Sequence, residues 1–166
     1  MNLDAERPSS RATLIIGVGN AYRRDDAVGL IVARRLRACG LENVTVREAS
    51  GEGGALMDAW QDAQTVILVD AAQSGAAAGT LHRFDAQREP IPTQFLHYST
   101  HAFGVAEAIE LARALRQLPL RVIVYAIEGQ NFGAGDELSP DVARAVEDAV
   151  EQIRRDVNSE PKEQKI

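Results

Sequence analysis

Residues 13–36 read TLIIGVGNAYRRDDAVGLIVARRL, and this stretch contains the first unit of the fold. It opens with an apolar run rich in β-branched residues (13–17), which predicts a buried strand. A glycine-containing turn follows, and apolar residues then recur at helical spacing from Val28 to Cys39. Gly40 provides a helix stop signal. A strand, a turn and a helix in this order predict one unit of an α/β protein.

The rest of the chain continues this alternation of strands and helices. Further strands are predicted at 43–48, 65–72, 79–85 and 121–128, and further helices in a short segment through Trp60, at 105–115 and at 140–157. Because several strand runs are continuously apolar, we expect a five-stranded, mainly parallel sheet with helices on both faces, a three-layer αβα sandwich. The sequence divides into a polar tail (1–12), one α/β domain (13–157) and a C-terminal tail that is expected to be disordered (158–166).

The composition limits the classes of function. The chain has 166 residues, of which 45% are hydrophobic and 25% charged, as is typical of a soluble single domain. Its formal net charge of −6 disfavours nucleic-acid binding, and the arginines at 34, 35 and 37 are assigned to a solvated helix face. No stretch is apolar enough to span a membrane, and the first residues lack the apolar centre of a signal peptide. A cytoplasmic location is therefore expected. Cys39, on the apolar stripe of its helix, is expected to be buried.

The expected topology places several polar segments at one edge of the sheet. In open parallel sheets, ligands bind beyond the carboxyl ends of the strands. The segments expected there are the Gly17–Asn20 turn after the first strand, the glycine-rich loop 50–54 after the second, Asp70 near the end of the third, Glu128 at the end of the last, and His101 at the start of the helix after the long loop.

Two adjacent aspartates follow the first turn. The glycines resemble a phosphate-binding turn, but Tyr22 stands where a third glycine would be needed, and Asp25 and Asp26 would repel a phosphate. An acidic pair suits a cation. Carboxylates alone favour Mg²⁺ or Ca²⁺, whereas an added imidazole moves the preference toward Zn or Ni. We therefore expect Asp26, Asp70 and His101 to form a mixed oxygen and nitrogen metal site, while Asp25 alone could be a helix N-cap.

Other interpretations remain open for single residues of this set. Taken alone, Asp70 could be a turn residue, and His101 could begin a helix without a further role. His97 lies four positions before His101, but Tyr98 stands where an H-E-x-x-H zinc-protease motif would have glutamate. His82 falls inside a predicted strand and has no evident partner.

Three motifs together resemble those of the nickel–iron hydrogenase maturation endopeptidases. They are GVGNAYRRDDAVG (17–29), ILVDAAQSG (67–75) and STHAFG (99–104), and the resemblance extends in order from about Leu14 to about Val157. It implies the twisted αβα fold and an enzyme that removes the C-terminal extension of the hydrogenase large-subunit precursor after nickel insertion. It also places the metal-contacting residues on Asp26, Asp70 and His101.

The resemblance carries further expectations about the metal and the partner. The nickel is expected to be presented by the precursor, although Zn or Cd could occupy the site in vitro, and the enzyme is expected to be a monomer. The chain departs from the family where a G-G-T-x-G loop is often found, since it has Glu52 between Gly51 and Gly53. This change adds a carboxylate near the expected site. The roles of Glu52 and Glu128 are left open.

The sequence favours attack by water over covalent catalysis. It contains no G-x-S-x-G nucleophile motif, and Cys39 is expected far from the site. A metal could polarise the carbonyl and lower the pKa of bound water to about 7, or Asp26 or Asp70 could act as a general base. Two alternative classes are a non-catalytic chaperone of a metallo-subunit and a small nucleotide-binding α/β protein.

Overall fold

The computed structural model describes residues 12–92, 95 and 102–159, and its elements occur in the predicted order. The elements are β1 (Thr13–Val18), the short 3-10 helix η1 (Arg24–Ala27), α1 (Val28–Ala38), β2 (Val44–Ala49), α2 (Gly53–Ala59), β3 (Thr65–Ala72), β4 (Leu81–Asp85), α3 (Val105–Ala114), β5 (Arg121–Glu128) and α4 (Pro140–Asn158).

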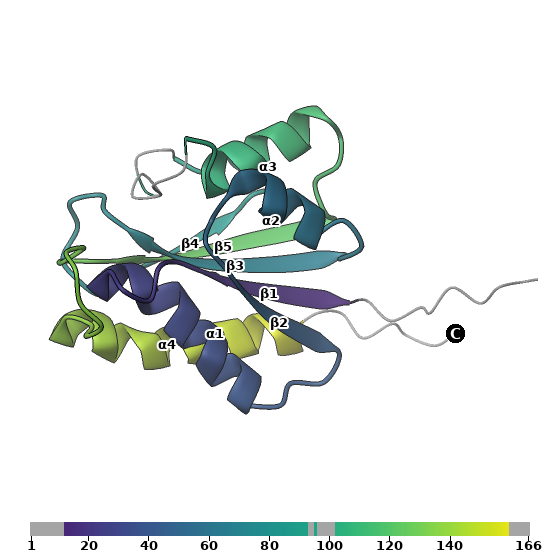
Figure 1. The fold of residues 1–166 in the computed structure, drawn as a ribbon. Coiled ribbons are helices and arrows are strands. Elements are labelled where there is room, and N and C mark those ends of the chain that lie inside the picture. Colours follow the sequence, from purple (N-terminus) through teal and green to yellow (C-terminus); the bar gives the residue numbers. More distant parts are fainter. Residues whose placement is uncertain (1–11, 93–94, 96–101, 160–166) are drawn as a thin grey trace, which may run out of the picture.

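The sheet has five strands in the order β2-β1-β3-β5-β4. All neighbouring pairs are parallel except β4 with β5, which is antiparallel. Figure 1 shows the three layers, with α2 and α3 over one face of the sheet and α1 and α4 over the other. The predicted fold class is therefore confirmed. The parallel strands β1, β3 and β5 bring their carboxyl ends to the same edge.

Alternating residues of the strands build two separate cores. Leu14, Leu68 and Val124 pack toward α2 and α3, whereas Ile67 and Ile123 pack toward α1 and α4. Every residue of β3 is buried, because this strand is central and covered on both faces. The continuous apolar run that the sequence shows at 65–72 is the direct consequence of this position.

The surface of α1 differs from the sequence-based prediction at one residue. Cys39 was expected to be buried, but it is exposed. The helix ends at Ala38 and Cys39 is its C-cap, so the last buried residue of the stripe is Leu36. The prediction for the basic cluster is confirmed, since exposed Arg34 and Arg37 pair with Glu48 of β2.

The longest helix, α4, has 19 residues. Neither α4 nor any other described helix combines the length and the apolar character that crossing a membrane requires. One face of α4 packs on the sheet through Val142, Val146 and Ile153. The helix is therefore amphipathic, and it covers one side of a single layer of strands.

Candidate functional site

The glycines of the first motif allow close contact between α1 and the sheet. A Cβ atom on Gly17 would overlap the carbonyl oxygen of Gly29, and a Cβ on Gly29 would overlap the carbonyl oxygens of Val18 and Val69. The space above Gly19 is likewise filled, by the carbonyl oxygen of Asp26. The three glycines are therefore used for close backbone packing within the chain itself. These contacts place η1 directly over the carboxyl ends of β1 and β3.

Asp26 and Asp70 meet at this edge of the sheet. Asp26 comes from η1, which contacts β3, and Asp70 lies within β3, two residues before its end. Both side chains are buried, with 8% and 7% of their surface exposed. In the described part of the chain, the Asp70 carboxylate accepts one hydrogen bond, from the backbone N–H of Ala71 at 2.8 Å. Two buried carboxylates from distant segments therefore lie close enough for the charge of one to act on the other.

The proximity of the two acids changes their electrostatics. Burial raises the pKa of Asp70 well above its ordinary value, and the neighbouring charge of Asp26 raises it further. Burial also raises the pKa of Asp26, against the opposing effects of the Arg23 charge and the Asn20 N–H group. Two like charges in a buried site disfavour joint ionisation unless a cation or a proton lies between them. The two carboxyl groups are therefore coupled, and at least one of them is held in an environment that disfavours its charged form.

Asp25, the other member of the acidic pair, has a structural role. It is fully buried, and its carboxylate accepts hydrogen bonds from the backbone N–H groups of Gln130, Asn131 and Ser139 and from the Ser139 hydroxyl, at 2.7–2.8 Å. Burial tends to raise the pKa of Asp25, but these hydrogen bonds outweigh it and lower the pKa. Asp25 does not cap α1, so its interpretation as the N-cap of that helix was wrong. Its carboxylate instead holds the 129–139 loop and the start of α4.

The glycine-rich loop after β2 meets the segment that follows His101. The N–H of Gly53 donates to the carbonyl oxygen of Phe103 at 2.9 Å, and a Cβ on Gly53 would overlap the Phe103 ring. Glu52 is the N-cap of α2 and accepts hydrogen bonds from Gly54 and Ala55. The extra carboxylate of this loop therefore has a helix-capping role. Sequence reasoning missed the contact of Gly53 with Phe103, although both residues belong to motifs that it had singled out.

The third predicted ligand, His101, lies outside the described residues, and so does His97. Phe95 and Phe103, the described residues on either side, are both anchored on the face of the sheet that carries Asp70. Phe95 accepts a hydrogen bond from Gln73 and packs on the rings of β4. Among the described residues alone, no group of three or more His, Cys, Asp or Glu side chains is arranged to hold a metal. The three-ligand site stays a prediction.

Buried Glu128 and half-buried His82 form a second polar group on the same face. Glu128 is buried and accepts hydrogen bonds from the Ser74 N–H, the Ser74 hydroxyl and the Gly75 N–H. The Nε2 atom of His82 lies 3.4 Å from Glu128 Oε2 without hydrogen-bond geometry, and its ring packs edge-on against Phe95 at 4.7 Å between centroids. His82 therefore has partners that its position in a strand did not reveal. Glu128 fixes the loop that follows Asp70.

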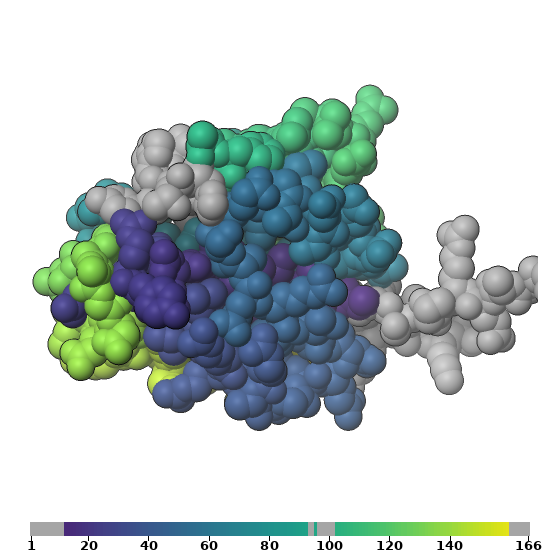
Figure 2. Space-filling view, in the orientation of Figure 1, coloured from purple at the N-terminus to yellow at the C-terminus, as the bar shows by residue number. Residues whose placement is uncertain are grey.

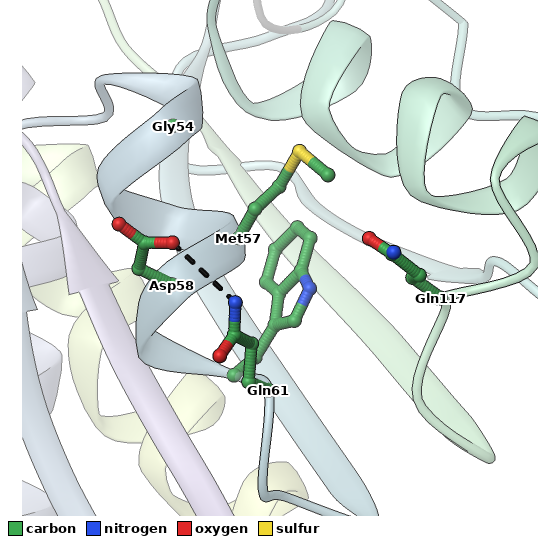
Figure 3. Close-up of a pocket in the computed structure, with 6 residues that line it drawn as sticks. Gly54, Met57, Asp58, Gln61 and Gln117 are labelled. Carbon is green, nitrogen blue, oxygen red and sulfur yellow. Dashed lines mark hydrogen bonds between the residues drawn. The ribbon is translucent and has the colours of Figure 1, made fainter.

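A separate groove runs between α2 and the turn after α3. It has a volume of about 480 Å³ and is lined by Gly54, Met57, Asp58, Trp60, Gln61 and Gln117. Figure 3 shows Met57 and Gln117 on its two sides, and the hydrogen bond from Gln61 to Asp58. Its lining holds one carboxylate and no histidine or cysteine. The groove therefore offers less scope for cation or acid–base chemistry than the Asp26–Asp70 edge.

The fold and its edge define a small three-layer α/β protein with a pair of buried, interacting carboxyl groups at the carboxyl ends of the strands. Comparison with known families gives a match to the hydrogenase maturation protease model over residues 31–156. The chain therefore belongs to the hydrogenase maturation protease family. This membership confirms the resemblance found in the sequence and the expected class of enzyme, a protease.

Individual relatives agree with this assignment. The chain is 24% identical over 144 residues to the hydrogenase 2 maturation protease of Escherichia coli, covering 84% of this chain and 87% of that protein. It is 25% identical over 143 residues to the hydrogenase expression/formation protein HupD of Thiocapsa roseopersicina, covering 83% of this chain but only 64% of that protein's length.

Solved structures support the fold. The hydrogenase-maturating endopeptidase HybD from E. coli superposes with a TM-score of 0.71 at 19% identity, over 89% of this chain and 92% of that one. The nickel–iron hydrogenase maturation protease HybD from Thermococcus kodakarensis gives a TM-score of 0.66 at 24% identity, over 87% and 97%. At this level of identity, these similarities establish the shared architecture.

Proposed function

We propose that this chain is the endopeptidase that removes the C-terminal extension of a nickel–iron hydrogenase large-subunit precursor. The observation that carries the proposal is the pairing of Asp26 with buried Asp70 at the carboxyl edge of the sheet. A buried acidic pair is unfavourable alone and favourable around a cation. A nickel ion presented by the precursor would supply that cation, so that the loaded precursor is the form that binds.

The roles of the residues follow from their chemistry. Asp26 and Asp70 would contact the nickel as oxygen ligands, and His101 would add an imidazole nitrogen, a donor set that suits a first-row transition metal. Bound there, the nickel would orient the precursor and could polarise a carbonyl as a Lewis acid. One of the two carboxylates would accept the proton of the attacking water. Asp25 and Glu128 would keep the surrounding loops in place.

Mass spectrometry of the precursor tests the proposal. A nickel-loaded precursor incubated with the wild-type chain is expected to lose one fixed C-terminal piece. Asp26→Asn, Asp70→Asn and His101→Ala are each expected to abolish this loss. Asp62→Asn is the matched control, because Asp62 is an exposed aspartate just before β3, at the opposite edge of the sheet.

The outcomes separate the candidate classes. A precursor that binds but keeps its full mass would favour the chaperone alternative. Normal cleavage by all three site variants would remove the proposed Asp26, Asp70 and His101 site. Cleavage of nickel-free precursor at the same rate as loaded precursor would contradict recognition through the metal.

A further inference from the structure

Tyr22 is an exposed aromatic residue beside the candidate site. Its residue surface is 81% exposed, the largest value among the big hydrophobic residues that the structure describes as exposed. It lies four positions before Asp26, in the turn that leads from β1 to η1. Figure 2 shows this N-terminal part of the fold, in dark purple, at the surface next to the light-green loop that follows β5. The exposed ring and Asp26 are therefore carried by the same short segment.

The backbone on both sides of Tyr22 is fixed. The Tyr22 N–H donates to the side-chain oxygen of Asn20 at 2.9 Å, and its carbonyl accepts from the N–H of Gly135 at 3.0 Å. The N–H of Arg24 donates in turn to the Gly135 carbonyl at 3.0 Å. These bonds hold the turn and the 129–139 loop together. The buried carboxylate of Asp25 adds further hydrogen bonds to the same loop. The ring projects from a rigid support.

Arg24 gives a second sign that this turn is held in one shape. Its φ of 45° lies in the left-handed region, which is costly for a residue other than glycine. The Arg24 side chain donates from Nε to the carbonyl of Ala134 at 3.1 Å, which ties the turn to the 129–139 loop once more. The chain maintains an unfavourable conformation between the exposed Tyr22 and the buried Asp25.

We propose that Tyr22 is a docking residue whose ring inserts into an apolar depression on the metal-loaded precursor, beside the bond to be cut. The inference rests on the proposed function, since it assigns the surface that receives the same substrate. Aromatic residues on rigid supports are favoured as interface hot spots, because their large surface is buried with little loss of conformational entropy. Tyr22 lies on the same segment as Asp26, so a precursor bound at the Asp26–Asp70 edge is the partner within reach of its ring.

Variants at this position separate docking from chemistry. We would measure the affinity of the immobilised chain for the nickel-loaded precursor, and separately the rate of cleavage over a range of precursor concentrations. Tyr22→Ala is expected to weaken binding and raise KM about thirtyfold, the effect of losing one interface hot spot of about 2 kcal/mol, with kcat changed less than about twofold. Tyr22→Phe keeps the ring and is expected to behave like the wild type.

Leu120→Ala is the matched control. Leu120 is 78% exposed, similar to Tyr22, but it directly precedes β5 and so lies at the opposite edge of the sheet. It is expected to leave both binding and cleavage unchanged. A Tyr22→Ala variant with wild-type affinity and KM would overturn the docking proposal, and so would a loss in kcat larger than the change in KM.

The readouts also distinguish this proposal from the proposed function. If the wild-type chain binds the precursor without shortening it, the endopeptidase assignment fails, while the affinity of Tyr22→Ala still tests docking. If the wild-type chain cuts the precursor and Tyr22→Ala binds it equally well, only the docking proposal fails. A wild-type chain that does not bind the loaded precursor would overturn both.

Discussion

Two neighbouring aspartates, Asp25 and Asp26, have different roles because their side chains leave the backbone in different directions. The Asp25 carboxylate accepts four hydrogen bonds from the 129–139 loop, two of which come from Ser139. Asp26 points to the edge of the sheet, where its charge acts on Asp70. The carboxylate of Asp25 is therefore saturated by hydrogen bonds within the protein, whereas that of Asp26 interacts with a second acid.

Replacing Asp25 tests the structural role. Asp25→Asn keeps the size of the side chain but removes a charged acceptor from three buried or half-buried N–H groups. We expect the free energy of unfolding to fall by about 3 kcal/mol, the effect of breaking a buried charged hydrogen-bond network. Urea unfolding followed by circular dichroism measures this change. Asp136→Asn, an exposed aspartate in the same loop, should alter stability by less than about 0.5 kcal/mol, and an equal loss in both variants would contradict the assignment.

At the scale of elements, α4 is attached to the sheet by a polar contact at the end opposite the site. Asp156 of α4 accepts hydrogen bonds from the Tyr125 hydroxyl at 2.5 Å and from Arg83 at 2.9 and 3.1 Å. Burial acts to raise the pKa of Asp156, but the hydrogen bonds from Arg83 and Tyr125 outweigh it and lower the pKa. The same burial and the Asp156 charge raise the pKa of Tyr125. The contact therefore joins the last helix to β4 and β5.

The lowered pKa predicts an acid-dependent contribution to stability. A carboxylate with a lowered folded-state pKa stabilises the fold fully above its ordinary pKa of about 3.9, and this stabilisation is lost as the pH falls through the folded-state value. Asp156→Asn should therefore be less stable than the wild type at pH 7, and the difference should shrink below about pH 4. Urea unfolding at a series of pH values measures both.

Glu151 provides the control for this prediction. Its side chain is 62% exposed and pairs with Arg155 one helical turn away, so Glu151→Gln should change stability by less than about 0.5 kcal/mol at every pH. If the difference between Asp156→Asn and the wild type were independent of pH down to pH 3, the stabilising role of the Asp156 charge would be wrong.

At the scale of the whole molecule, the two edges of the sheet differ in chemistry. The edge at the carboxyl ends of the parallel strands carries Asp26, Asp70 and Glu128, together with the turn after β1 and the 129–139 loop. The opposite edge carries connections such as the one that contains Leu120. This asymmetry is general for parallel sheets, since all strand-to-helix turns leave from the same side. Here it concentrates acidic side chains, whose negative charge makes this edge poorly suited to a phosphate.

This asymmetry predicts that nucleotides do not bind. The glycines at 17, 19 and 29 are covered by the chain's own backbone, and the nearby carboxylates repel phosphate groups. Isothermal titration with ATP or NAD is expected to give no saturable heat at concentrations up to about 1 mM, an affinity limit of roughly −4 kcal/mol. Saturable binding that is unaffected by Asp26→Asn would instead favour the nucleotide-binding class.

Much of the fold could be predicted because its signals are local. The β-branched runs and the helical spacing each lie within one element, and they gave all five strands and the helix order. Asp25 shows the limit, since Ser139, which its carboxylate binds, is 114 positions away and no local pattern indicates that pairing. Cys39 was misassigned because the apolar stripe continues one turn beyond the buried part of α1. The meeting of Asp26 with Asp70 was predictable from topology, because strand ends converge.

The tight seating of α1 has one more consequence. The carbonyl oxygens of Val18 and Val69 lie so close to Gly29 that any side chain at position 29 would push α1 away from β1 and β3, and with it the adjoining turn that carries Asp26. Under the proposed function, the acidic pair would distinguish metal-loaded precursor from empty precursor. If the proposed function holds, a precursor whose centre is filled would bring a positive ion to the two acids, and an empty one would bring nothing to offset their repulsion. The discrimination between loaded and empty precursor would then depend on the close packing of α1 at Gly29.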